Sequence, residues 1–184
     1  TMNLNGAFTT ANMFAFNRSA GSSVNLLGSL DNTGNTVDIG GAGLFGTGGL
    51  SNLSGTIKSG TLVSNDGTIL NTSGNIRIVD GVTIGSNLTV NGELNIYHGL
   101  TLGSGATVNK GGSAWYFNGY DTGQAAGTVH SLATLGNSTV NNAGGPIYMY
   151  ANNGQTLQID AGVTVQGFGS LPQYFVGNTI INAG

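Results

Sequence analysis

The sequence predicts an all-β chain that folds as a single-stranded, right-handed parallel β-helix, with about 18–19 residues per coil and three short strands in each coil. Three observations lead to this prediction. Apolar residues come in pairs at i and i+2, successive pairs begin six residues apart, and the gaps hold mostly Gly, Asn, Asp and Ser. The pattern is clearest between Ile76 and Asn109.

The apolar pairs predict the strands. Residues i and i+2 of a strand point to the same face, so each pair supplies one inward-facing side of a coil. The residue between them, mostly Thr or Asn, is expected to point outward. The six strands predicted in this stretch carry the pairs Ile76 and Ile78, Val82 and Ile84, Leu88 and Val90, Leu94 and Ile96, Leu100 and Leu102, and Ala106 and Val108.

Turn formers separate these strands. Gly and Asn accept the positive φ that a sharp corner needs. A helix is excluded, because Gly and β-branched residues would be scattered through every turn of it. The predicted corners are Asp80-Gly81, Gly85-Ser86-Asn87, Asn91-Gly92, His98-Gly99 and Gly103-Ser104-Gly105.

A longer period predicts how the strands stack. A shift of 18 residues superposes Val82 on Leu100, Ile84 on Leu102, Thr83 on Thr101 and Thr89 on Thr107, and a shift of 19 superposes Ile57 on Ile76. Two large apolar residues on each side favour the right-handed solenoid over the left-handed hexapeptide form. Roughly ten coils at a strand spacing of ~4.8 Å predict a rod on the order of 50 Å long.

We expect one domain. Residues 1–184 form a single β-solenoid segment, which we expect to be excised from a longer repetitive surface protein. The less regular stretch 111–138 is expected to be one coil that carries an insertion.

The composition excludes several classes of function. Charged residues make up 6% of the chain, the four Lys and Arg residues form no basic patch, and the net charge is −3, so nucleic acid is not an expected partner. The chain has no Cys, so it cannot form a disulfide or a thiolate metal site. No apolar run approaches the ~20 residues of a membrane helix. We expect no cofactor, no metal and no direct membrane insertion.

The acidic residues do not predict catalysis. A polysaccharide-cleaving solenoid needs two carboxylates on one face. No two of the seven acids, Asp31, Asp38, Asp66, Asp80, Glu93, Asp121 and Asp160, lie 18 or 19 residues apart. Asp80 falls one coil below His98, where a pair that caps a turn is the simpler interpretation. We therefore expect no catalytic residues and no enzyme.

The aromatic residues predict a contact surface instead. Trp115, Tyr116 and Tyr120 crowd into one short stretch with Asp121, and Tyr148 and Tyr150 follow later in the chain. Exposed aromatic clusters often bind sugar rings or partner proteins. We predict Trp115, Tyr116, Tyr120 and Asp121 as ligand-binding or contact residues. The alternative is that Trp115 and Phe117 fill the core while Tyr116 caps it.

The stretches LTVNGELNI, LTLGSGATVN, DAGVTVQGFGSL and GNTIINAG resemble the filamentous haemagglutinin-type adhesins and autotransporter passengers of Gram-negative bacteria. The resemblance implies a right-handed β-helix and an extracellular protein, secreted by a type V system or held at the bacterial cell surface. It implies a non-enzymatic stalk, filament or self-associating adhesin repeat of the kind found in biofilms. Implied partners are a glycan or protein on a host or neighbouring cell, or copies of the chain. The NPNG motif of two-partner secretion domains is absent.

Two alternative functions stay open. One is a carbohydrate-binding or carbohydrate-cleaving β-helix with its site near Trp115–Asp121. The other is an ice-binding solenoid, because outward Thr columns such as Thr83/Thr101 and Thr89/Thr107 can order water.

Overall fold

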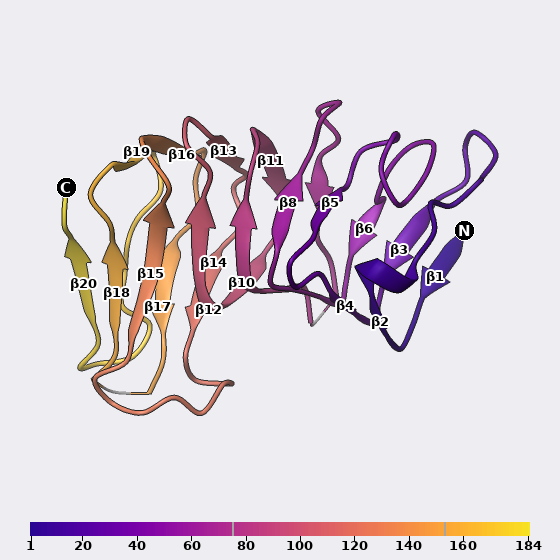
Figure 1. Cartoon of the computed structure of the whole chain (residues 1–184). Coiled ribbons are helices and arrows are strands. Elements are labelled where there is room, and N and C mark those ends of the chain that lie inside the picture. Colours follow the sequence, from indigo (N-terminus) through magenta and orange to yellow (C-terminus); the bar gives the residue numbers. More distant parts are fainter. Residues whose placement is uncertain (75, 153) are drawn as a thin grey trace.

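The chain folds as a stack of parallel coils, which Figure 1 shows side by side from the N-terminal to the C-terminal end. The computed structural model describes residues 1–74, 76–152 and 154–184. Every strand pair in it is parallel, and the stack completes about eight turns, so the predicted all-β parallel solenoid is confirmed. Within the described ranges, the one helical turn is a 3-10 turn at Thr10–Asn12 (η1).

One face of the solenoid is built from two sheets, which meet where Leu53 of one bridges to Thr72 beside the other. In order along the axis its strands are β1 (Met2–Leu4), β3 (Val24–Leu26), β6 (Asn52–Leu53), β9 (Leu70–Asn71), β11 (Leu88–Asn91), β13 (Thr107–Lys110), β16 (Ser138–Asn142) and β19 (Val163–Gly167).

The other two faces belong to one large sheet. The second face contains β2 (Ala7–Thr9), β4 (Ser29–Asp31), β7 (Thr56–Lys58), the first halves of β10 (Ile78–Ile84) and β12 (Leu94–Leu102), β14 (Trp115–Asn118) and β17 (Ile147–Tyr150). The third contains β5 (Thr36–Asp38), β8 (Thr61–Val63), the second halves of β10 and β12, β15 (Val129–Thr134), β18 (Thr156–Ile159) and β20 (Thr179–Asn182).

Strands β10 and β12 each run through a corner and so belong to two faces. Ile78 at the start of β10 pairs with β7, whereas Ile84 at its end pairs with β8. The register shifts between Asp80 and Val82, where Gly81 has a φ of +61°. At the equivalent corner of β12, His98 and Gly99 have φ values of +55° and +87°. Both corners match the turn residues predicted from the sequence.

Inward and outward side chains alternate along each strand, and the inward side chains form the core. Val82, Ile84, Leu100 and Leu102 are buried, and the intervening Thr83 and Thr101 are half-buried on the outer side. Each core side chain packs on the residue one coil away, as Val82 does on Leu100. The pair Ile76 and Ile78 breaks the predicted phase, because Ile76 is exposed and Val79 is the buried residue that pairs with Ile96.

The coil length differs from the prediction of 18–19 residues. The predicted step of 18 residues is found between Asp80 and His98, and Thr83 does pair with Thr101. Other steps are longer: Asn3 and Asn25 are 22 residues apart, and Asn109 and Asn141 are 32 apart. The predicted Thr89/Thr107 column is wrong, since Thr89 pairs with Asn109. Longer coils explain why about eight turns form where roughly ten were expected.

The long coil lies in the stretch where the sequence is least regular. Thr107 of β13 pairs with Thr139 of β16 in the next coil. Between them the chain forms β14, then a loop over residues 119–128, then β15. A loop of this kind projects outside the stack, so the strands on either side keep an unbroken parallel register.

Several polar side chains are buried inside the stack and make hydrogen bonds there. Asn178 Nδ2 donates to the carbonyl of Ala151 at 2.8 Å, and its Oδ1 accepts from the backbone of Gln155 at 3.1 Å. His130 lies inside the stack in β15; its Nε2 is 2.8 Å from Gln155 Oε1, whereas its Nδ1 is buried without a hydrogen-bond partner. Such bonds are required because an unpaired buried polar group is costly.

No helix in the described part of the chain is long and apolar enough to span a membrane.

Inward and outward positions should respond differently to a charge. Leu100 is 1% exposed and packs between Val82 and Leu132. We expect Leu100→Asp to lower the free energy of unfolding by several kcal/mol, because it buries an unpaired carboxylate. Thr101→Asp, one residue further along the same strand, should cost no more than about 1 kcal/mol. Denaturant melts of the two variants compare them, and equal losses would contradict the inward and outward assignments.

The buried imidazole should make the fold sensitive to mild acid. Burial lowers the pKa of His130, outweighing the hydrogen bond with Gln155. Because the folded pKa lies below the unfolded value of about 6.5, stability is full above that value and is lost as the pH falls through it. We expect the free energy of unfolding to fall between about pH 7.5 and pH 5. His130→Gln, which can still hydrogen-bond but does not titrate, should flatten this dependence; an unchanged slope would show that His130 is not its source.

Candidate functional site

The outer side of the second face carries a group of tyrosines near the C-terminal end. In β14 and β17 the alternation turns Tyr116 and Tyr148 outward, in register with one another. A following segment continues this face, since Pro146 bridges to Ser170 and Met149 bridges to Gln173. The next residue, Tyr174, therefore lies beside the two strands. We call the cluster formed by Tyr116, Tyr120, Tyr148, Tyr150, Tyr174 and Phe175 the tyrosine face.

The rings of the tyrosine face touch in a continuous group. Tyr116 stacks on Tyr148 with ring centroids 5.3 Å apart and planes 15° apart. Tyr174 meets Tyr150 edge-on at 4.7 Å and Tyr148 at 5.2 Å. Tyr120 stacks on Phe175 at 5.8 Å. Edge-to-face and offset contacts at these separations are favourable, so the rings hold one another in place.

A polar depression of about 200 Å³ opens in this face. Aromatic rings form part of its wall, and amide and charged groups form the rest. Its lining residues are Arg77, Asn95, Tyr116, Asn118, Asp121, Tyr150 and Tyr174. The guanidinium of Arg77 is paired with the carboxylate of Glu93.

Asp121 is fixed at the edge of the depression. Asn118 Nδ2 donates to Asp121 Oδ2 at 2.8 Å, and Asn118 Oδ1 accepts from the Asp121 backbone N–H at 3.0 Å. The hydroxyl of Tyr97 donates to the same Oδ2 at 3.3 Å. Burial and the neighbouring Asp121 carboxylate raise the pKa of Tyr97 to about 12, so this hydroxyl keeps its proton at neutral pH.

Three of the four residues predicted as contacts lie at or beside the depression, and the fourth is buried in the core. Tyr116 and Asp121 line the depression, and the half-exposed Tyr120 lies beside it on the tyrosine face. Trp115 was wrongly predicted, because it is 0% exposed and packs between Leu94 and Ile147. Phe117 is buried as well, so these two aromatics follow the alternative in which they fill the core.

Other residues of the site were not predicted from the sequence. Tyr174 and Phe175 occur in a stretch, LPQYFVG, that lacks the six-residue spacing of apolar pairs. Arg77 and Asn95 come from coils much earlier in the chain. One feature of the sequence does point to Tyr174. The segment LPQYF places two aromatic residues shortly after a Pro, as the segment PIYMY does with Tyr148 and Tyr150.

The acidic residues form one neighbouring pair away from the tyrosine face. The carboxylates of Asp38 and Asp66 both crowd Gly40, where a Cβ would lie 2.5 Å from Asp66 Oδ1 and 3.0 Å from Asp38 Oδ1. The two residues are 28 positions apart, so a spacing of 18 or 19 residues does not relate them. Each accepts backbone hydrogen bonds, Asp38 from Gly40 and Asp66 from Gly41, and the Gly41 bond is the main reason that the pKa of Asp66 is lowered to about 2. They therefore brace the loop that follows β5.

The predicted pairing of Asp80 with His98 is found, with Asp80 Oδ1 bound to His98 Nδ1 beside the corner of β12. Among the residues that the structure describes, no group of three or more His, Cys, Asp or Glu side chains comes together in a way that could hold a metal ion.

Comparison with models of known protein families, with curated proteins and with solved structures gave no match to this chain.

Proposed function

We propose that this chain is a non-enzymatic adhesive segment of an extracellular surface protein, and that its tyrosine face contacts a glycan. The observation that carries the proposal is the polar depression bordered by Tyr116, Tyr150 and Tyr174. Pyranose rings present an apolar C–H face and a rim of hydroxyls. Tyrosine offers a flat apolar ring together with a hydroxyl, so it suits both parts of such a ligand.

The position of the site supports an adhesive role. Its residues come from successive coils of one stack, and backbone ladders fix the spacing of those coils. The surface is therefore preorganised, which lowers the entropic cost of binding. Sparse charge, high Gly content and the absence of Cys suit a long exported repeat protein. The resemblance to bacterial adhesins and autotransporter passengers supports the extracellular, cell-surface placement.

Binding is favoured over cleavage at this site. Glycoside hydrolysis requires an acid and a second carboxylate that flank the scissile bond. The depression has one lining carboxylate, Asp121, and its Oδ2 already accepts bonds from Asn118 and Tyr97. The carboxylate of Glu93 is paired with Arg77, which lines the depression. A carbohydrate-cleaving enzyme is therefore the weaker candidate.

A glycan array followed by titration of the best ligand tests the proposal. We expect Tyr174→Ala to lower the affinity at least tenfold, as for an aromatic anchor at the centre of a contact. Phe14→Ala is the matched control, because Phe14 is also a highly exposed aromatic but belongs to the opposite end of the chain; it should bind as the wild type does.

Failure of the wild type to bind any glycan, or equal binding by Tyr174→Ala of every glycan that the wild type binds, would overturn the proposal. Release of reducing sugar from a bound glycan that Asp121→Asn abolishes would favour the enzyme instead.

A further inference from the structure

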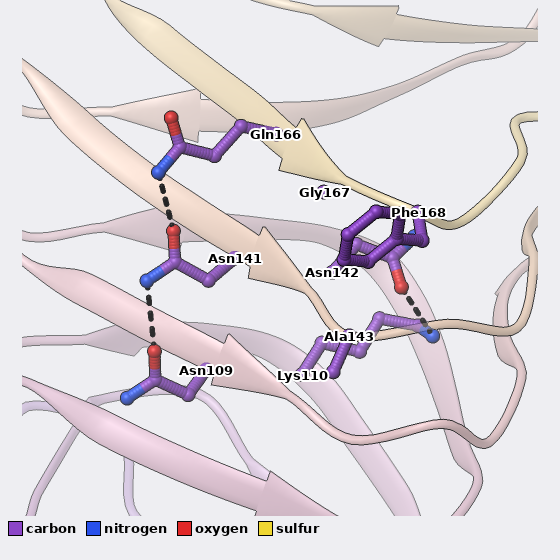
Figure 2. Close-up of a pocket in the computed structure, with 8 residues that line it drawn as sticks. All are labelled: Asn109, Lys110, Asn141, Asn142, Ala143, Gln166, Gly167 and Phe168. Atoms are coloured by element: carbon purple, nitrogen blue, oxygen red, sulfur yellow. Dashed lines mark hydrogen bonds between the residues drawn. The ribbon is translucent and has the colours of Figure 1, made fainter.

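A second and larger cavity lies on the first face of the solenoid. Its volume is about 460 Å³, within the range of small-molecule sites in proteins. It forms where β13, β16 and β19 end, and Figure 2 shows the residues around it. They are Asn109, Lys110, Asn141, Asn142, Ala143, Gln166, Gly167 and Phe168.

One wall of the cavity is a ladder of side-chain amides that spans three coils (Figure 2). Gln166 Nε2 donates to Asn141 Oδ1 at 2.7 Å, and Asn141 Nδ2 donates to Asn109 Oδ1 at 2.9 Å. Each of these bonds uses one N–H or one lone pair of an amide. The remaining N–H groups and lone pairs stay available to solvent and recur at the strand spacing of ~4.8 Å.

The other wall is an unusually exposed aromatic ring. Phe168 is 95% exposed although its ring is wholly apolar. Its backbone N–H donates to the Asn142 carbonyl at 3.0 Å, which ties the corner down. The preceding Gly167 has a φ of +118°, and a Cβ there would lie 2.1 Å from the same carbonyl. The backbone therefore sets where the ring stands, next to Asn142 and across from the amide ladder (Figure 2).

The cavity offers no free charge to a ligand. Lys110 lines it but is 1% exposed, and its ammonium donates to Gly144 O at 2.7 Å, Asn142 Oδ1 at 3.1 Å and Gly111 O at 3.2 Å. All three of its N–H donors are thus used. The other seven lining residues are uncharged. A ligand that fits must be neutral, must carry groups that both donate and accept hydrogen bonds, and must have one apolar face.

From this arrangement we infer that the cavity is a binding site for a neutral glycan, separate from the tyrosine face. One pyranose ring of the glycan stacks on Phe168, and hydroxyls of that sugar and its neighbours in the chain bond to the amides of Asn109, Asn141 and Gln166. A peptide strand is a poorer match, because the ladder amides and Phe168 project from the flat of the sheet, whereas an added strand would pair along the backbone edge of β19. The site lies on a different face from the tyrosines, so this inference does not depend on the function proposed above.

The test uses the whole chain and a panel of defined probes: cellohexaose, xylohexaose, mannohexaose and maltohexaose, with hexagalacturonate as the charged comparison. Calorimetric titration is expected to show binding of at least one neutral hexasaccharide and weaker or no binding of the uronate. Phe168→Ala should lower that affinity at least tenfold. Asn141→Ala, which breaks the middle of the ladder, should lower it as well.

Phe14→Ala is the control, because Phe14 is also highly exposed but lines neither site, and it should leave this affinity unchanged. Because Phe168 is almost fully exposed, its truncation should not shift the unfolding midpoint, so lost binding cannot be attributed to lost folding. The inference is overturned if no neutral hexasaccharide binds, if Phe168→Ala binds as the wild type does, if the uronate binds more tightly, or if Phe14→Ala loses the same ligand equally.

Discussion

The register between neighbouring coils is the constraint on which the rest of this structure depends. Each inward side chain lies over its counterpart one coil away, as in the column Val82, Leu100 and Leu132. Burial of these columns supplies the main stabilising term, and the parallel backbone ladders fix their spacing. The same ladders place every outward side chain. Tyr116 meets Tyr148, and Asn109 meets Asn141, because Trp115 and Val108 beside them are locked into the core.

The sequence was sufficient for the fold class, for most inward and outward positions and for the corners at Gly81 and Gly99. It was insufficient for the coil length. Corner loops of different length close the same coil at little extra entropic cost, so the pairing partner cannot be found from a fixed period. Asn141 lies 32 residues beyond its partner Asn109 for this reason. The candidate site was found in part: Tyr116 and Asp121 belong to it, whereas alternation buries Trp115, and Tyr174 joins it from a coil without a regular pattern.

Both proposed contact surfaces are built from outward side chains that line up from coil to coil, but the side chains differ in chemistry. On the second face, outward tyrosines from successive coils stack into a platform with a polar depression. On the first face, outward amides from successive coils bond into a ladder beside Phe168. The first-face cavity offers no free charge, and in the depression Arg77 is paired with Glu93 while Asp121 accepts hydrogen bonds from Asn118 and Tyr97. Two sites on one stiff body would allow a single molecule to hold two glycan chains, with the gain in avidity that linked sites give.

Cysteine pairs test the unequal coils most directly, because the natural chain has no Cys to interfere. In the variant Thr107→Cys with Thr139→Cys, the two residues are strand partners in β13 and β16, within the Cα separation that a disulfide allows. The comparison variant is Thr107→Cys with Ala125→Cys, which would be partners if every coil had about 18 residues. Mild oxidation followed by non-reducing electrophoresis and mass mapping is expected to show an intramolecular disulfide in the first variant and none in the second. A disulfide that forms readily in the second variant and not in the first would contradict the register on which both proposed sites depend.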